Sequence, residues 1–168
     1  INKPIAIRIV NELRKINPDL EVVLQDTTSS EEDLNAAGRL ALNKFGDRLR
    51  VYFSVHTNAC EAKDANGYMF ITGGNATWSD NKLADNLSKA MANNPYVRQR
   101  NNMYNANYIG ELNVVDNFNT IAVLGEFGFF TNDKDLDNLT KDEYIDYIAR
   151  NVANEISSLL NKIDKNKK

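Results

Sequence analysis

The sequence contains a single histidine, His56, and one glutamate, Glu126, that stands inside a strongly apolar run. His56 follows the run VYFSV, and Glu126 lies in TIAVLGEFGF among glycines and phenylalanines. Burial of an ionised glutamate is costly and raises the pKa of its carboxyl group, which suits a general acid or base. An imidazole can bind a metal or can be a hydrogen-bonded structural residue, and Glu126 could equally form an ion pair with Arg39 or Arg98. The residues alone therefore predict a His/Glu site, with structural roles left open.

The rest of the composition excludes several kinds of site. A single cysteine, Cys60, allows no internal disulfide framework and no cysteine-based zinc site, and a single histidine allows no HExxH motif. The 168 residues predict one domain, and the net charge of -3 argues against a general nucleic-acid binder. No apolar stretch reaches the ~18 residues of a membrane span. We expect a monomer with no nucleic-acid partner and no membrane span.

Helical and strand-like segments alternate along the chain. Apolar spacing predicts helices over 5–15, 31–45, 79–92 and from Thr140 through Leu160, and strands over 20–24, 49–55, 67–72 and 120–129. The pattern weakens over 93–119, which predicts loops with room for one irregular strand. Strands separated by helical segments imply crossover connections. We therefore expect a single α/β domain over 1–162, with a mainly parallel sheet flanked by helices on both faces in three layers, and a disordered tail over 163–168.

The ends of two predicted strands bring the polar candidates together. Ligands of open α/β sheets bind beyond the carboxyl ends of the strands. His56 ends one predicted strand, and Glu126 lies near the end of another. The sequence thus predicts one site that holds both residues.

Two longer motifs around these residues resemble a known family. The run FSVHTNA resembles the S-[IV]-H-x-N-A motif of the zinc-dependent N-acetylmuramoyl-L-alanine amidases of the type-three amidase family, found in bacterial autolysins and phage endolysins. VLGEFGFFTNDKD resembles the family's C-terminal motif [VL]-[LV]-x-E-x-[GS]-F-[ILF]-[ST]-N-x-x-[DE]. Between them, GYMFITG and a helix containing Leu83 and Ala84 follow the family's order, and 1–6 resembles the start of its first helix. The resemblance spans essentially the whole chain.

The resemblance implies roles for individual residues. His56 would be a zinc ligand, and Glu126 would be the catalytic acid/base that faces the metal-bound water. Asn58, Arg98 and Arg100 are candidates for the substrate rim, where the arginines could meet stem-peptide carboxylates or remain solvated. The neighbouring rings of Phe127, Phe129 and Phe130 are expected to pack around Glu126.

The resemblance also implies that part of the zinc site is missing from this sequence. The family's other two zinc ligands are a histidine in a glycine-rich loop after the first strand and a glutamate just before the segment matched by Asn2. Neither has a counterpart in the chain. A catalytic zinc usually takes three protein ligands and a water. We therefore expect an N-terminally incomplete domain with an incomplete zinc site and an unpaired sheet edge.

The implied activity is hydrolysis of peptidoglycan. A zinc-activated water would cleave the amide between N-acetylmuramic acid and L-Ala of the stem peptide, outside the cell at the wall, after secretion or phage release. Autolysin, sporulation enzyme and endolysin fit equally well. A degenerate, non-catalytic domain that binds peptidoglycan and a zinc peptidase that cuts peptide cross-links remain alternatives. Thiol catalysis at Cys60 is disfavoured, because the only histidine is already assigned to the metal.

Overall fold

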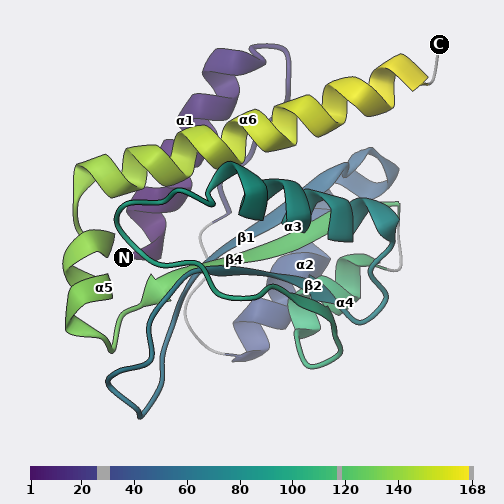
Figure 1. The fold of residues 1–168 in the computed structure, drawn as a ribbon. Coiled ribbons are helices and arrows are strands. Elements are labelled where there is room, and N and C mark those ends of the chain that lie inside the picture. Colours follow the sequence, from purple (N-terminus) through teal and green to yellow (C-terminus); the bar gives the residue numbers. More distant parts are fainter. Residues whose placement is uncertain (26–30, 117–118, 167–168) are drawn as a thin grey trace.

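The computed structural model describes residues 1–25, 31–116 and 119–166. The elements, in chain order, are α1 (Asn2–Ile16), α2 (Glu31–Phe45), η1 (Gly46–Arg48), β1 (Val51–Asn58), β2 (Met69–Gly73), α3 (Trp78–Ala90), β3 (Met103–Ala106), α4 (Gly110–Asp116), β4 (Ile121–Phe129), α5 (Asp133–Leu139) and α6 (Asp142–Asn166). Figure 1 shows the sheet crossing the middle of the molecule, with α1, α3 and α6 on one side and α2 and α4 on the other. The predicted α/β domain with helices on both faces is confirmed.

The sheet is mixed, so the prediction of a mainly parallel sheet is confirmed only in part. Its strand order is β1-β4-β2-β3. The pairs β1/β4 and β2/β3 are parallel, whereas β2 runs antiparallel to β4. The connection over 59–68 contains no helix. Parallel strands need a crossover of a dozen or more residues, usually helical, and this connection lacks one, so β2 returns in the opposite direction.

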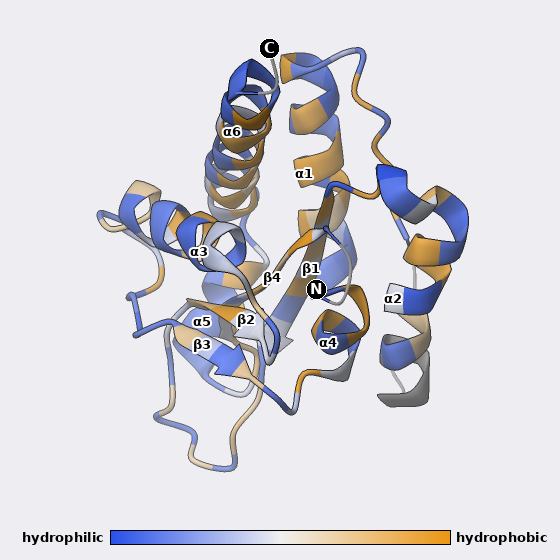
Figure 2. Ribbon diagram, turned by 90° about the vertical axis from the view of Figure 1, so that its right-hand side faces the viewer, coloured by the Kyte–Doolittle hydropathy of each residue, from blue (hydrophilic) through white to orange (hydrophobic). Residues whose placement is uncertain are grey.

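The two faces of the sheet carry separate apolar clusters. On one face, Val123 and Phe127 of β4 pack with residues of α1, α3 and α6. On the other, Leu124 packs with Leu112 and Val115 of α4. Because neighbouring residues of a strand point to opposite faces, β4 serves both clusters and is buried nearly throughout. Figure 2 shows the apolar positions of α1 and α6 where these helices lie beside each other.

Residues 20–24 do not form the predicted strand. The segment has no strand partner, and Val23 and Leu24 are 41% and 36% exposed. Its backbone is held by a side chain instead, since Arg14 donates a hydrogen bond to the carbonyl of Val22 (3.0 Å). The run was also expected to be buried on both faces, but only Leu20 and Val22 pack against the core, and both are partly buried. A strand also requires a hydrogen-bonded neighbouring strand, and this segment has none among the described residues.

Helix α6 extends beyond its predicted end. Residues 163–166 are helical rather than part of a disordered tail, and residues 167–168 lie outside the described ranges. The extension is stabilised because Ile163 packs against the core and Asp164 pairs with Arg50 (2.6 Å). Neither α6 nor any other helix in the described ranges is long and apolar enough to cross a membrane.

A bulge near the end of β4 changes the pairing with β1. His56 is opposite Glu126, but Asn58 is opposite Phe129, so β4 advances one extra residue over this interval. Gly128, with φ of +148°, lies within the bulge. Asp135 of α5 holds it from outside, accepting hydrogen bonds from the backbone N–H groups of Phe129 (2.9 Å) and Gly67 (2.8 Å). The GEFGF run thus forms a bulge near the end of β4, with Gly128 in a backbone conformation that only glycine adopts easily.

We predict that Gly128→Ala lowers the free energy of unfolding by about 2 kcal/mol, because its φ is strained for any residue with a Cβ. The added Cβ would also lie 3.3 Å from Leu139 Cδ1. Gly46→Ala is the matched control, since Gly46 has φ of +55° and open space around its Cβ position. It should cost about 1 kcal/mol. Urea denaturation measures both values, and equal losses would contradict a special role for Gly128.

Candidate active site

The pairing of β1 with β4 places His56 directly beside Glu126. These two residues are opposite one another in the parallel ladder, and Ser54 is likewise opposite Leu124. Residues paired across a ladder share one face of the sheet, and Leu124 belongs to the face covered by α4. The structure therefore brings the two predicted site residues together, on the α4 side of the sheet.

A second glutamate, Glu111 at the start of α4, completes the polar cluster. Its side chain is only 4% exposed, and its Oε1 lies 3.0 Å from His56 Nε2. It accepts further hydrogen bonds from Ser54 Oγ (2.9 Å, at Oε1) and Tyr52 Oη (2.8 Å, at Oε2). Sequence reasoning missed Glu111 because it lies in the weakly patterned interval 93–119. One available signal was the alternation of Tyr52, Ser54 and His56, which gives one face of β1 three polar groups.

Glu126 retains an unsatisfied oxygen. Its Oε2 is buried and has no hydrogen-bond partner. Burial raises the pKa of Glu126 to about 7; the nearby His56 acts to lower this pKa, and the charge of Glu111 raises it further. The predicted structural ion pairs do not form, because Arg98 donates to Asn66 and Arg39 is exposed. A buried carboxyl group with a pKa near neutrality can both accept and return a proton.

The pKa of His56 is raised above its usual value. Burial acts to lower this pKa, but the hydrogen bond to Glu111 and the negative charges of Glu111 and Glu126 outweigh burial. The side chain is 21% exposed, so the ring remains accessible from one side. The imidazole thus stands between two carboxylates at the carboxyl end of β1.

The predicted rim residues are engaged in contacts of their own. Asn58 Oδ1 accepts a hydrogen bond from the N–H of the next residue, Ala59 (2.8 Å). Arg98 donates to the Asn66 side chain, and Arg100 donates to the Asn66 carbonyl (3.0 Å) and lies over the Phe129 ring, 5.3 Å from its centroid. The arginines thus brace the 59–67 connection, and their role toward a substrate stays a prediction.

The three phenylalanines do not surround Glu126 together. Phe127 is fully buried on the opposite face, with its ring centroid 6.0 Å from that of Phe70, and Phe130 is 44% exposed. Alternation along β4 explains the difference, since Glu126 and Phe127 must point to opposite faces. Glu126 is buried instead by its position between β1 and β2, where it is opposite both His56 and Met69.

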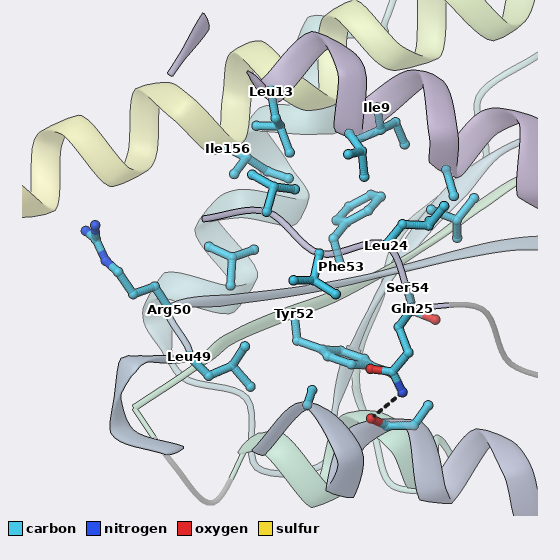
Figure 3. A pocket seen from close by; sticks show the side chains of 18 of the residues that line it. Ile9, Leu13, Leu24, Gln25, Leu49, Arg50, Tyr52, Phe53, Ser54 and Ile156 are labelled. Carbon is cyan, nitrogen blue, oxygen red and sulfur yellow. Dashed lines mark hydrogen bonds between the residues drawn. The ribbon is translucent and has the colours of Figure 1, made fainter. Parts of the chain in front are cut away.

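A groove of about 940 Å³ follows the outer side of β1. Figure 3 shows it bordered by Ile9 and Leu13 of α1, by Tyr52 and Phe53 of β1, and by Leu24. Gln25 closes one side with a hydrogen bond to the carbonyl of Ala37 (3.0 Å). Because β1 is the outermost of the described strands, the groove runs along an edge of the sheet that no other described strand pairs with. His56 and Glu111 also line it, so the polar cluster opens into this space.

The donors of the cluster match zinc in kind. Zinc takes imidazole nitrogen and carboxylate oxygen ligands, and the buried, unpaired Oε2 of Glu126 beside His56 is an oxygen of this type. The number of donors is too small for a zinc site, because within the described ranges no group of three or more His, Cys, Asp or Glu side chains could hold a metal ion. A complete zinc site would need ligands in addition to these.

Comparisons with known proteins agree on one family. The family model described as N-acetylmuramoyl-L-alanine amidase matches residues 1–158. The N-acetylmuramoyl-L-alanine amidase from Clostridium difficile 630 is 26% identical, with a TM-score of 0.76, over 94% of this chain and 81% of that chain. The catalytic domain of the amidase CwlV from Bacillus (Paenibacillus) polymyxa var. colistinus is 24% identical, with a TM-score of 0.73 and the same coverage. The catalytic domain of the CD27L endolysin is 17% identical, with a TM-score of 0.65 and again the same coverage. A comparison with curated protein sequences gave no match.

We predict that Glu126→Gln removes a pH-dependent loss of stability. The carboxyl group has a pKa of about 7 in the folded protein and an ordinary value of 4.5, so the folded state keeps a proton that the unfolded state releases between these pH values. The free energy of unfolding of the wild type should therefore fall by about 2–3 kcal/mol relative to the variant as pH rises from 4.5 to 7.

Urea denaturation at a series of pH values measures this difference. Glu61→Gln is the control, because Glu61 is exposed and its variant should follow the wild type at every pH. Parallel curves for Glu126→Gln and the wild type would contradict a raised pKa at Glu126.

Proposed function

Because the chain belongs to the N-acetylmuramoyl-L-alanine amidase family, we propose that it cleaves the amide between N-acetylmuramic acid and L-Ala of the peptidoglycan stem peptide. The observation that supports this most is the pairing of His56 with Glu126 across β1 and β4. It places an imidazole next to a buried carboxyl group with an unpaired oxygen and a pKa near 7. In metal-assisted amide hydrolysis, an imidazole can bind the metal ion that polarises the scissile carbonyl. A carboxyl group can transfer protons between the attacking water and the leaving amine.

We further propose that the site works with zinc. When bound, zinc would polarise the scissile carbonyl and lower the pKa of a water molecule. In this chain His56 would bind the ion through a ring nitrogen. His56 alone would not complete a zinc site, and within the described ranges no group of three or more His, Cys, Asp or Glu side chains could hold the ion.

Glu126 would carry the protons. Its free Oε2 can accept a proton from the attacking water and later deliver it to the leaving amine nitrogen. Glu111 is not suited to this role, because Tyr52, Ser54 and His56 already occupy its two oxygens. The two glutamates therefore have separate roles, although both face His56.

Substrate contacts and location follow from the proposed reaction. Arg98 and Arg100, braced on Asn66, would present positive charge to stem-peptide carboxylates, and Asn58 would shape the rim near His56. A peptidoglycan substrate places the activity at the cell wall, outside the cell, reached by secretion or by release from phage-infected cells. We expect the domain to act as a monomer.

A second candidate function is a non-catalytic domain that binds peptidoglycan. It is favoured by one observation, the lack of a complete three-ligand metal group among the described side chains. The buried Oε2 of Glu126, which has no hydrogen-bond partner, argues against it, because a binding domain gains nothing from the cost of burying that oxygen.

We predict that the chain, incubated with Zn²⁺ and purified peptidoglycan, releases amino termini that belong to L-Ala. A chelator should abolish the release, and Glu126→Gln should lower the rate by about 10²–10⁴-fold, because general acid–base catalysis is lost. Glu61→Gln should keep the wild-type rate. Labelling of new amino termini followed by residue analysis measures each result.

Three outcomes would contradict the proposal. New termini on residues other than L-Ala would identify a cross-link peptidase. Sedimentation with peptidoglycan but no release of amines would identify a binding domain. A near-normal rate for Glu126→Gln would remove that residue from the mechanism.

A further inference from the structure

Exposed aromatic rings gather at one corner of the molecule, far from the outer side of β1. Within the described ranges four aromatic side chains are exposed, and three of them border strand β3 or the start of helix α3. These three are Trp78, Tyr104 and Tyr108, at 73%, 47% and 68% exposure, and Trp78 is the only tryptophan. Exposed apolar surface that is gathered in one place and rimmed by polar residues marks a binding surface.

The fold brings these rings to one side of α3. Strands β2 and β3 run parallel and pair at their carboxyl ends, and Figure 2 shows β3 at the edge of the sheet beneath α3. Trp78 begins α3 soon after β2, and Tyr108 follows β3 by two residues. On α3, Trp78 and Asp85 are about two turns apart and share one side of the helix, roughly 10 Å apart along its axis. Asp85 accepts a hydrogen bond from Tyr104, so the tyrosine ring borders the same side of α3.

Polar contacts hold the exposed ring of Tyr104 in place. Its hydroxyl donates a hydrogen bond to Asp85 and accepts one from Asn102 Nδ2 (3.3 Å). Asn102 is itself anchored, because its Oδ1 accepts hydrogen bonds from the N–H of Phe70 (3.0 Å) and from Ser88 Oγ (2.8 Å). The ring is therefore fixed at its polar end while much of it stays exposed. A surface that is already ordered loses less conformational entropy when a ligand binds.

A polar hollow of about 660 Å³ lies beside this ring, between α3 and the segment 99–104. This volume is in the range of ligand sites. Apart from Ala92 and the Tyr104 ring, the side chains that line it are polar, and the charged ones are Asp85, Lys89 and Arg100. The cores of protein–protein interfaces are depleted of charged residues. The hollow therefore favours a polar ligand with an apolar face over another protein.

A saccharide has this combination of surfaces. One face of a pyranose ring presents C–H groups that pack on an aromatic ring, and the hydroxyl groups around it need hydrogen-bonding partners. Tyr104 supplies the ring, and Gln99 and Asn101 supply exposed amide groups at the edge of the hollow. Trp78 lies further along the same side of α3. An extended chain of sugars can reach both rings, whereas a single sugar cannot.

The charges of the hollow favour a saccharide that carries carboxylates. Lys89 is exposed, and Arg100 donates its printed hydrogen bond to a carbonyl, so both keep their positive charge. The opposing charge of Asp85 is engaged by Tyr104. The proposed cleavage leaves one carboxylate on each N-acetylmuramic acid that loses its peptide. Arg100 also belongs to the predicted substrate rim, so the hollow continues from that rim toward Tyr104.

We propose that the hollow beside Tyr104 is a binding site for the glycan chain of peptidoglycan, with sugar rings on Tyr104 and Trp78 and a sugar carboxylate at Lys89. The choice of this glycan rests on the proposed function, whereas the saccharide chemistry does not. The site is separate from His56 and Glu126, because Tyr104 bonds to α3 on one side of the sheet and Glu126 faces α4 on the other. The chain would thus hold the polymer at one place while it acts at another.

The test uses Trp78 as a single fluorescent reporter. The chain is titrated with peptidoglycan glycan strands from which the stem peptides have been removed, and binding is followed by tryptophan emission and by sedimentation with insoluble glycan. The emission should change on binding. Tyr104→Ala should weaken binding about 3–10-fold. Lys89→Gln should weaken it about 2–5-fold, and high salt should remove this difference. Leu40→Ala is the control, since Leu40 is 55% exposed on α2 across the sheet, and it should bind like the wild type.

Four outcomes would overturn the proposal. These are no binding of the glycan, equal binding by Tyr104→Ala and the wild type, binding of free stem peptide instead of glycan, and self-association of the chain that Tyr104→Ala abolishes. Tyr104→Phe guards against a folding defect, because it keeps the ring and removes only the hydrogen bonds of the hydroxyl group. Its affinity should lie between those of the wild type and Tyr104→Ala.

This experiment is independent of catalysis, because the peptide-free glycan has no amide to cleave. Glycan binding that depends on Tyr104, together with no release of amino termini from intact peptidoglycan, would support the glycan site and contradict the proposed amidase activity. Release of L-Ala termini together with equal glycan binding by all variants would support the activity and overturn the glycan site.

Discussion

The register of the parallel pair β1/β4 is the constraint on which the site depends. It places His56 opposite Glu126 on the face covered by α4, and Ser54 and Tyr52 follow on the same face. A slip of one residue would turn Glu126 to the opposite face, where Phe127 now packs against Phe70. The bulge at Gly128 comes only after this pair, so the ladder remains regular up to the site and changes beyond it.

Burial of charge is the second condition that shapes the cluster. Glu111 is deeply buried, and the hydrogen bonds from Tyr52 and Ser54, together with the contact with His56, compensate for the loss of water around it. Glu126 is compensated less, since one of its oxygens has no hydrogen bond. This difference in hydrogen bonding follows from where the two glutamates lie in the fold. Glu111 faces the polar side chains of β1 from α4, whereas Glu126 lies within the ladder between His56 and Met69.

Local pattern predicted the elements better than their pairing. The helices around Ile9 and Ile148 and the strands before His56 and Glu126 have apolar periods strong enough to be recognised. The antiparallel direction of β2 could not be predicted from period alone, because it depends on the helix-free connection 59–68. The run at Leu20–Leu24 was wrongly predicted as a strand because apolarity indicates burial but not a hydrogen-bonded neighbour.

The site was partly predictable for the same reasons. His56 and Glu126 end apolar strands, and strand ends meet at one edge of a sheet. Glu111 is 55 positions from His56 in the chain and opens a helix of only seven residues, too short to show a helical period. Its role depends on a tertiary contact. Tyr52 and Ser54 contact Glu111 only in the folded chain, so the strand period alone could not reveal these hydrogen bonds.

The most direct measurement of the central claim is a pH titration of the His56 ring by ¹⁵N NMR in the wild type and in Glu126→Gln. The negative charge of Glu126 contributes to the raised pKa of His56 across the β1/β4 pair. The account predicts that the pKa of His56 is lower in Glu126→Gln than in the wild type, while Glu61→Gln leaves it unchanged. Equal pKa values in all three proteins would contradict the placement of His56 and Glu126 in one site.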